Sequence, residues 1–355
     1  MKKICQLYMP SFYRSFGHSA LSRVIGSLES IKKAGFSGIY LIALWLDGGF
    51  DNGFDIIEYV VNPNFGTSIQ LCNLIAKAHE LGLEVGVDVV PNHVSDRNFL
   101  ADKCLAGELG FEDALYVVSE EDAKRLTEAG VPSFFGKYAY SPIDKKFVRS
   151  TFVDYYQLNV NWDSKMVIEY FAGVFRRLKG YGVDFVRVDC GMMLHEDVTK
   201  ADKNNPIATY DVEKSVKAVI EVAGGMPLFF EWFGPFSLDI FNGLDNCYAL
   251  DCSYVLTGQQ NLEWKHPKLV PLVGGHDQMT LADRGIDKGE ALQKMEESPS
   301  EYAFLDMQTL LETATEAEIQ PEDKDYDASL DNPNQRYRGR RPIKPVLDEF
   351  TRRFT

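Results

Sequence analysis

The residues best suited to chemistry are acids that end or directly follow short apolar runs. Asp189 ends one run, Glu231 ends the next, and Asp277 follows a third. Arg187 precedes Asp189 by two residues, which puts both side chains on one face of an extended strand. Such polar residues stand at the ends of four runs: Asp88, His93, Arg187, Asp189, Glu231, His276 and Asp277. Helix capping explains a single aspartate at a strand end as well as catalysis does, but it does not explain four such coincidences.

Three carboxylates with one arginine and two histidines suit a substrate that develops positive charge. A glycosyl oxocarbenium ion is such a species, because one carboxylate attacks it while a protonated carboxyl donates to the leaving oxygen. These two roles require different pKa values, which the surroundings of each group must set. Arg187 would keep a nucleophilic Asp189 ionised, and the histidines would donate hydrogen bonds to sugar hydroxyls.

A divalent metal site is the alternative, since Asp, Glu and His side chains also ligate metals. Arg187 disfavours it, because a fixed cation beside the ligands opposes metal binding.

The elements that must position these residues alternate in type along the chain. Apolar runs typical of buried strands are 4–9, 38–45, 83–90, 183–189, 227–231, 248–250 and 269–273. Between several of them, apolar residues recur with helical spacing, as in 21–31, 71–81 and 167–178. This alternation predicts parallel strands with right-handed crossovers. A closed barrel and an open doubly wound sheet both fit it, but no Gly-x-Gly-x-x-Gly follows the first strand, which disfavours nucleotide binding.

The run spacing also predicts the domain organisation. We expect a barrel, because the polar residues at the strand ends would then converge on one rim. Its two parts are predicted to be 1–93 and 162–310. The stretch 94–161 is too long for one helix and its loops and is predicted to be an inserted rim subdomain. The segment 311–355 is acidic and then basic. We expect its acidic residues 312–331 to be exposed, and its basic run 336–341 to pair internally rather than to bind phosphate.

Composition limits the partners. The 355 residues carry 37 Lys plus Arg against 52 Asp plus Glu, a net charge of −15, so nucleic acid and anionic membranes are not expected partners. The first ten residues contain Gln6 and Pro10 and no sustained apolar run, so neither a signal peptide nor a membrane span is predicted. Six cysteines without Cys-x-x-Cys spacing indicate free thiols and a cytoplasmic location.

Four segments, in order, resemble the signatures of the α-amylase superfamily, glycoside hydrolase family 13. They are Asp88–His93, Gly182–Asp189, Phe229–Trp232 and Gly275–Asp277. Further similar segments are Tyr8–Phe12, Asp51–Asp55 and Gln157–Trp162. Each motif alone is weakly specific, whereas the ordered set from Gln6 to Asp277 is strongly so.

The resemblance implies an α/β fold, a (β/α)8 TIM barrel with a small subdomain inserted after strand 3 and an atypical C-terminal end. It implies that Asp189 is the nucleophile, Glu231 the acid/base and Asp277 the residue that binds ring hydroxyls of the distorted sugar. The residues implied to line the same subsite are Phe54, Asp55, His93, Arg187 and His276. Phe54 stands where the family usually has a tyrosine, so ring stacking is kept and the hydroxyl is lost.

Departures from the family pattern refine the expected activity. Met192 and Met193 replace a Lys-His pair of typical α-amylases, which favours a short-substrate α-glucosidase or transglucosidase over an endo-amylase. Thr280 stands where many exo-acting members have an arginine, with Arg284 as a nearby substitute. Asn159 replaces an acidic residue, so no cofactor is predicted and a structural calcium is disfavoured.

The sequence thus predicts a retaining α-glycoside hydrolase or transglycosidase acting on α-glucosides. A catalytically degenerate sugar-binding or interaction protein on the same barrel is the alternative. Its motivation is twofold: the substitutions around the leaving-side subsites, and the end of the chain, where no clear eighth strand is found. Tyr302–Leu305 is the best candidate for that strand, yet its neighbours have helical patterns. Oligomeric state, linkage and the choice between hydrolysis and transfer are not encoded in any motif.

Overall fold

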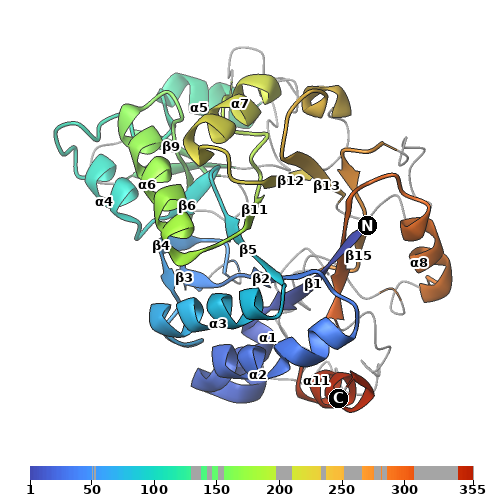
Figure 1. Ribbon diagram of the computed structural model, residues 1–355. Helices are drawn as coiled ribbons and strands as arrows, with labels where there is room; N and C mark the ends of the chain where they lie inside the picture. Colours follow the sequence, from blue (N-terminus) through green and yellow to red (C-terminus); the bar gives the residue numbers. More distant parts are fainter. Residues whose placement is uncertain are drawn as a thin grey trace.

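The apolar runs form one parallel sheet in the computed structural model (Figure 1). The structure describes residues 1–49, 51, 53–128, 137–141, 146–150, 156–196, 210–232, 237–251, 266–275, 281, 286–307 and 343–354. The sheet has nine strands: β1 (Lys2–Tyr8), β2 (Gly38–Ile42), β5 (Glu84–Val89), β11 (Phe185–Val188), β12 (Leu228–Trp232), β13 (Cys247–Asp251), β14 (Leu269–Val270), β15 (Leu272–Val273) and β16 (Tyr302–Asp306). All seven predicted strand runs are confirmed.

The sheet closes into a barrel at a strand interrupted by proline. β14 pairs with β13, while β15 pairs with β16, and only Pro271 separates β14 from β15. Pro271 has no N–H to give to a ladder, but its carbonyl accepts from the Phe304 N–H at 2.9 Å. The two short strands therefore share one position, and the family fold predicted from the motifs is confirmed.

The eighth strand, unclear in the sequence, is β16. It pairs in parallel with β1, from Lys2 opposite Tyr302 to Gln6 opposite Asp306. The candidate Tyr302–Leu305 is thus a barrel strand despite the helical patterns around it. The helix α8 (Lys288–Glu296) precedes it, and Lys3 of β1 forms an ion pair with Glu296 at 2.6 Å.

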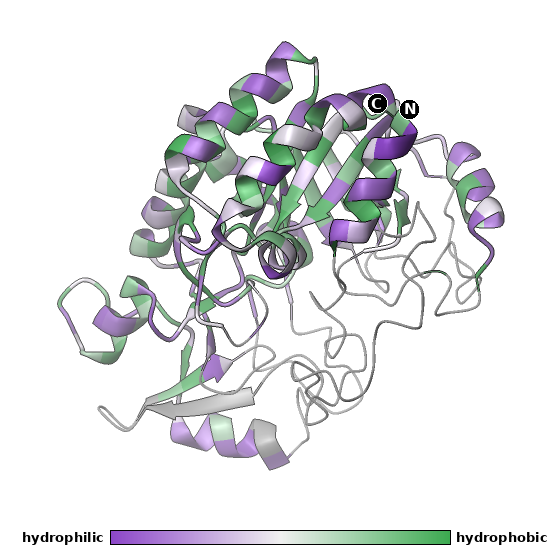
Figure 2. Cartoon of the chain, turned by 90° about the horizontal axis from the view of Figure 1, so that it is seen from below, coloured by the Kyte–Doolittle hydropathy of each residue, from purple (hydrophilic) through white to green (hydrophobic). Residues whose placement is uncertain are grey.

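Helices surround the barrel and turn their apolar faces inward (Figure 2). They are α1 (Met9–Phe16), α2 (Ala20–Lys33), α3 (Ser68–Glu80), α6 (Lys165–Tyr181), α7 (Val212–Ala223), α8 and α11 (Ile343–Phe354), with the 3-10 turns η1 (Gly17–Ser19) and η3 (Leu238–Phe241). The three segments predicted from helical spacing fall in α2, α3 and α6. None of the helices in the described part of the chain is long and apolar enough to cross a bilayer.

A second sheet lies beyond the carboxyl ends of the barrel strands, opposite the chain's N-terminus (Figure 2). Its strands are β6 (His93–Ser95), β7 (Val117–Val118), β8 (Lys137–Ser141), β9 (Lys146–Ser150) and β10 (Gln157–Asn159), with the helices α4 (Phe99–Leu105) and α5 (Glu120–Glu128) beside them. We call the described residues of this second sheet, its two helices and their connections the rim subdomain, whose bounds 94–161 stay a prediction. A short hairpin of β3 (Trp45–Asp47) and β4 (Ile56–Val61) lies between β2 and α3.

Aromatic rings fill the barrel interior. The Phe304 ring lies 5.7 Å from that of Tyr40 and 5.8 Å from that of Phe185. Gly86 leaves the room for Phe185, because a Cβ on Gly86 would lie 1.9 Å from that ring. This packing holds the strands in register and thereby fixes where their polar ends meet.

Candidate active site

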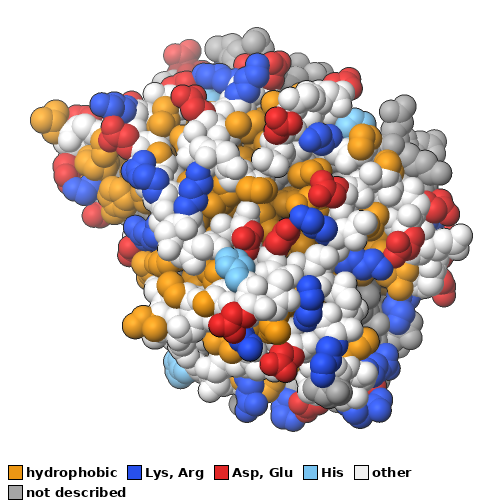
Figure 3. Space-filling view, viewed as in Figure 1, with side chains coloured by type: hydrophobic (Ala, Val, Ile, Leu, Met, Phe, Trp, Pro, Cys, Tyr) orange, Lys and Arg blue, Asp and Glu red, His pale blue; other side chains and the backbone are white. Residues whose placement is uncertain are grey.

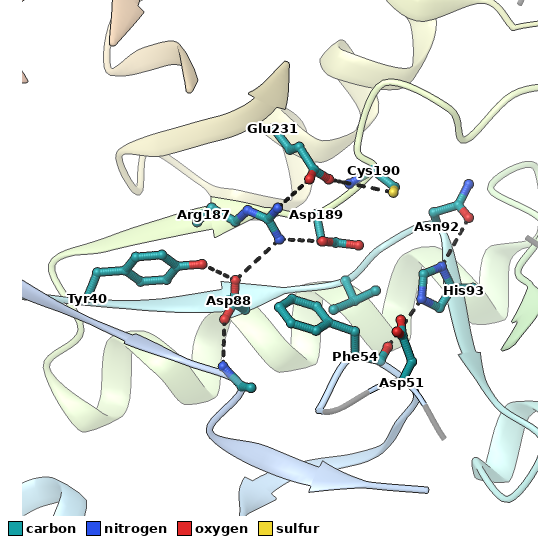
Figure 4. A network of polar contacts seen from close by, with 12 residues as sticks. Tyr40, Asp51, Phe54, Asp88, Asn92, His93, Arg187, Asp189, Cys190 and Glu231 are labelled. Carbon is teal, nitrogen blue, oxygen red and sulfur yellow. Dashed lines mark hydrogen bonds and ion pairs between the residues drawn. The ribbon is translucent and has the colours of Figure 1, made fainter. Parts of the chain in front are cut away.

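The acids at the strand ends converge as the barrel geometry requires (Figure 4). Arg187 lies opposite Asp88 in the ladder between β11 and β5. The Asp189 N–H continues this ladder, donating to the Val89 carbonyl at 2.9 Å. Glu231 is the fourth residue of the neighbouring strand β12. Three neighbouring strands therefore deliver three carboxylates and one guanidinium to one place.

Arg187 lies at the centre of this group and is 2 % exposed. Its Nη1 contacts the Asp189 carboxylate, and its Nη2 lies 2.6 Å from Glu231 Oε1. Burial disfavours the charge, but the carboxylates of Glu231 and Asp189 raise the pKa of Arg187 above its ordinary value. The guanidinium therefore stays charged and orients both acids.

Asp88 is held from behind rather than presented to a substrate. It accepts from the Tyr40 hydroxyl and, at 3.0 Å, from the Ala43 N–H, and it lies 3.5 Å from Arg187. Burial raises the pKa of Asp88 to about 6, and Arg187 limits the rise. Asp88 thus supports Arg187 and the end of its own strand.

Cys190 connects the two candidate catalytic acids. Its N–H donates to Glu231 Oε2 at 3.0 Å, and its Sγ lies 3.6 Å from the same oxygen. Burial, together with the charges of Asp189 and Glu231, raises the pKa of the Cys190 thiol well above its ordinary value. The thiol is therefore protonated, so Cys190 lines the site with an uncharged side chain.

Within the described part of the chain, one cluster has donor atoms at the spacing that a metal ion needs. Its members are Asp189, Cys190 and Glu231. One such atom from each lies within 4.8 Å of the others. Arg187 contacts both carboxylates, and its charge opposes a second cation there. The arrangement suits two acids that act on one bond better than it suits metal ligation, and the absence of a metal stays a prediction.

Phe54 and His93 lie on one side of this group. The Arg187 guanidinium lies 5.6 Å from the centre of the Phe54 ring, within reach of a cation–π interaction. His93 Nε2 lies 3.2 Å from the Phe54 carbonyl oxygen, and its Nδ1 lies 3.2 Å from Asn92 Oδ1. Burial lowers the pKa of His93 to about 4, against the opposing effect of the Asp51 carboxylate. The imidazole is therefore neutral near pH 7.

The other predicted residues are placed less centrally or not described. Asp55 is fully buried and accepts from the Asp51 N–H at 3.3 Å, which puts its carboxylate against the loop before it. His276 and Asp277 lie outside the described residues, as do Thr280 and Arg284. The described chain therefore brings together Phe54, His93, Arg187, Asp189 and Glu231.

Sequence reasoning missed two residues of this group, Tyr40 and Cys190. Tyr40 lies inside a predicted strand, and only its inward direction towards Asp88 reveals a role. Cys190 directly follows Asp189, a position that could have pointed to it. A buried thiol is usually core packing, however, so its type alone carries no such signal.

Comparison with known proteins identifies the family of the chain. Residues 6–223 match the family model "Alpha amylase, catalytic domain". The chain is similar to maltase A2 of Drosophila melanogaster, with 29% identity over 202 residues, 54% of this chain and 35% of that protein. It is also similar to an oligo-1,6-glucosidase of a Bacillus species, with 27% identity over 190 residues, 52% of this chain and 37% of that protein. The matched region thus spans about a third of the length of these curated relatives.

Solved structures agree on the fold. A structure described as a "Family GH13_31 enzyme" superposes with a TM-score of 0.75 at 16% identity, covering 99% of this chain and 71% of that one. At this identity the likeness concerns the fold alone.

Proposed function

Because the chain belongs to the alpha-amylase family, we propose that it is a retaining α-glycoside hydrolase or transglycosidase acting on α-glucosides. The observation that carries the proposal is the pair of carboxylates, Asp189 and Glu231, held by one buried arginine. Curated relatives such as maltase A2 are named for acting on maltose, and we extend that substrate class to this chain.

The proposed mechanism has two displacements. Asp189 attacks the anomeric carbon while the Glu231 carboxyl donates its proton to the departing oxygen, leaving a glycosyl ester on Asp189. Glu231, now a carboxylate, takes a proton from an incoming hydroxyl, whose oxygen displaces Asp189 from the sugar. Water as the acceptor gives hydrolysis and a sugar hydroxyl gives transfer.

The separation of the two acids supports retention of configuration. Oxygens of Asp189 and Glu231 lie within 4.8 Å of each other. Retaining enzymes hold their carboxyl groups about 5–5.5 Å apart, whereas inverting enzymes leave about 6.5–9.5 Å for a water molecule. The shorter spacing leaves no room for a water between Asp189 and the sugar, which supports direct attack by Asp189.

The remaining roles follow the family motifs. We propose that Asp277 and His276 bind hydroxyls of the reacting sugar and that Phe54, Asp55, His93 and Arg187 complete its subsite. Neither a cofactor nor calcium takes part in the proposed reaction. We further propose a cytoplasmic location, which the free thiols of the described cysteines support.

The alternative, a non-catalytic sugar-binding barrel, loses one of its two motivations. That motivation was the missing eighth strand, and β16 supplies it. A binding protein also has no need of two carboxylates in contact with one arginine.

Proton NMR of the purified protein with maltose, isomaltose, sucrose, trehalose and short maltodextrins tests the proposal. We expect the α-anomer to appear first, and Asp189→Asn to reduce turnover by on the order of 10³-fold or more, because the nucleophile is lost. Asp348→Asn, an exposed aspartate on α11, serves as the matched control and should leave turnover unchanged. Persistent turnover in Asp189→Asn, or the β-anomer as first product, contradicts the proposal.

A further inference from the structure

A buried ion pair joins the rim subdomain to the loop that follows the candidate nucleophile. Arg149 of β9 donates from Nε to Glu196 Oε2 at 2.8 Å, and the two side chains are 0% and 3% exposed. Taking two charges out of water carries a large desolvation penalty, so such a pair is weak evidence for a purely stabilising role. Its position, between the subdomain and the active-site loop, suggests another use.

Two tyrosines extend this connection. Arg149 Nη2 donates to the Tyr210 hydroxyl at 2.9 Å, and Tyr210 pairs with Glu196 in an isolated antiparallel bridge. The Tyr116 hydroxyl of the rim subdomain donates to the Glu196 carbonyl at 2.8 Å. Both the side chain and the backbone of Glu196 are therefore fixed to the rim subdomain.

Tyr210 in turn packs against the candidate catalytic centre. It forms a small buried cluster with Cys190 and Met193. Cys190 has a φ of 48°, in the left-handed region that a residue with a Cβ rarely adopts. Such strain persists only where the surroundings hold it, and it clusters at functional sites. In this conformation the Cys190 N–H points at Glu231 Oε2.

We infer that Arg149 and Tyr210 are positioning residues for the acid/base Glu231, acting through Cys190. Arg149 holds the Tyr210 ring against Cys190, and the ring keeps Cys190 in the conformation whose N–H orients the Glu231 carboxyl. This inference rests on the proposed function. It makes the rim subdomain part of the proton-transfer apparatus, with both residues acting through Cys190.

Substrates with different leaving groups distinguish the positioning of Glu231 from general structural support of the site. A disaccharide needs a proton on its departing oxygen, so its reaction depends on the orientation of the acid. α-Glucosyl fluoride loses fluoride without that proton. The parameter kcat/KM covers only the steps up to departure of the leaving group, so comparing the two substrates isolates proton donation from later steps.

The experiment measures kcat/KM for α-glucosyl fluoride and for the disaccharide that the wild-type protein cleaves fastest. Tyr210→Phe keeps the aromatic ring but removes the hydroxyl that accepts from Arg149, so Arg149 no longer holds the ring against Cys190. We expect it to lower kcat/KM for the disaccharide about tenfold and for the fluoride less than about twofold, since a misplaced acid loses part of its roughly 10²–10⁴-fold contribution. Arg149→Lys keeps the charge beside Glu196 but cannot make both bonds, and should show the same split.

Control variants define the largest and the smallest difference expected between the two substrates. Glu231→Gln removes the acid and should show the largest split between the substrates. Tyr181→Phe, at the end of α6, and Arg125→Lys, on the exposed face of α5, should change neither rate.

Two results overturn the inference. One is an equal fall on both substrates in Tyr210→Phe and Arg149→Lys, which indicates a general loss of site structure. The other is unchanged rates on both. Failure of the proposed function is visible separately, because the wild-type protein would then cleave neither substrate.

Discussion

At the scale of residues, the site consists of three carboxylates around the buried positive charge of Arg187. Asp88, Asp189 and Glu231 all lie within 3.5 Å of its guanidinium nitrogens. Asp88 is the acid whose pKa rises to about 6, because it is fully buried and shares the arginine with other carboxylates. Tyr40 and the Ala43 N–H donate to it and so keep its ionised form accessible.

His93 gives a pH-dependent prediction at the same scale. Its folded pKa of about 4 lies below the ordinary 6.5, so the unfolded chain binds the extra proton between these values. Stability therefore falls as pH drops from 6.5 towards 4, by about 3 kcal/mol from this group. We expect the unfolding free energy of His93→Gln to depend less on pH in this window, as urea titrations at pH 6.5 and 4.5 would measure.

The exposed His18 provides the control position for that experiment, because it is a surface histidine outside the candidate site. His18→Gln should retain the wild-type pH dependence. An identical pH dependence in wild type and His93→Gln would refute the assignment of a neutral, buried imidazole.

At the scale of elements, the barrel depends on how its last two strands close it. The seventh strand is interrupted at Pro271, so β15 and β16 share few backbone hydrogen bonds. Side chains must supply the cohesion that the ladder lacks. Phe304 does this from β16, where its ring contacts those of Tyr40, Phe185 and Phe229.

Phe304→Ala should therefore destabilise the protein by about 3–5 kcal/mol, the cost of removing a buried aromatic ring and leaving a cavity. Chemical denaturation followed by tryptophan fluorescence would measure it. Phe99→Ala, at a phenylalanine 43% exposed, is the matched control and should cost much less. Equal losses in both variants would mean that β16 does not close the barrel through this ring.

At the scale of the whole molecule, the last described helix, α11, packs against the first helices that surround the barrel. α11 buries Ile343, Val346, Leu347 and Phe350, and Phe350 lies 6.5 Å from the Phe36 ring that follows α2. The Ile343 N–H donates to Ser15 Oγ of α1 at 3.0 Å. The end of the chain thus covers the beginning of the barrel, beside α1 and α2 (Figure 1).

Removal of residues 343–355 should expose that apolar surface. We expect a melting midpoint lower by roughly 10 °C, since four buried apolar side chains each contribute about 1.5–3 kcal/mol before entropy costs. Differential scanning calorimetry would measure it. Lys344→Ala, which removes only an exposed ion pair with Asp348, should not shift the midpoint. An unchanged midpoint in the shortened chain would show that α11 is dispensable.

Charges of both signs are mixed on the face of the molecule opposite the candidate site. On the face shown in Figure 3, acidic and basic side chains are interspersed, without a broad basic patch. The net charge of −15 agrees with this.

The sequence by itself predicted the strands and the acidic and basic side chains that stand at their ends. Local apolar runs identify strands because burial on both faces demands them, and the order of motifs identifies Asp189, Glu231 and their arginine. These features are local, so they can be read without knowing the contacts between distant segments.

Only the tertiary structure decided how the barrel closes and what holds the acids. β16 forms because β1 offers it a ladder, a pairing between residues some 300 positions apart that local pattern does not encode. Tyr40 and Cys190 gain their roles from neighbours on other strands, and Arg149 gains its role from a loop beyond β11. Long-range contacts fix these roles, because the type of a side chain limits which groups it can bind, whereas the fold determines which groups lie next to it.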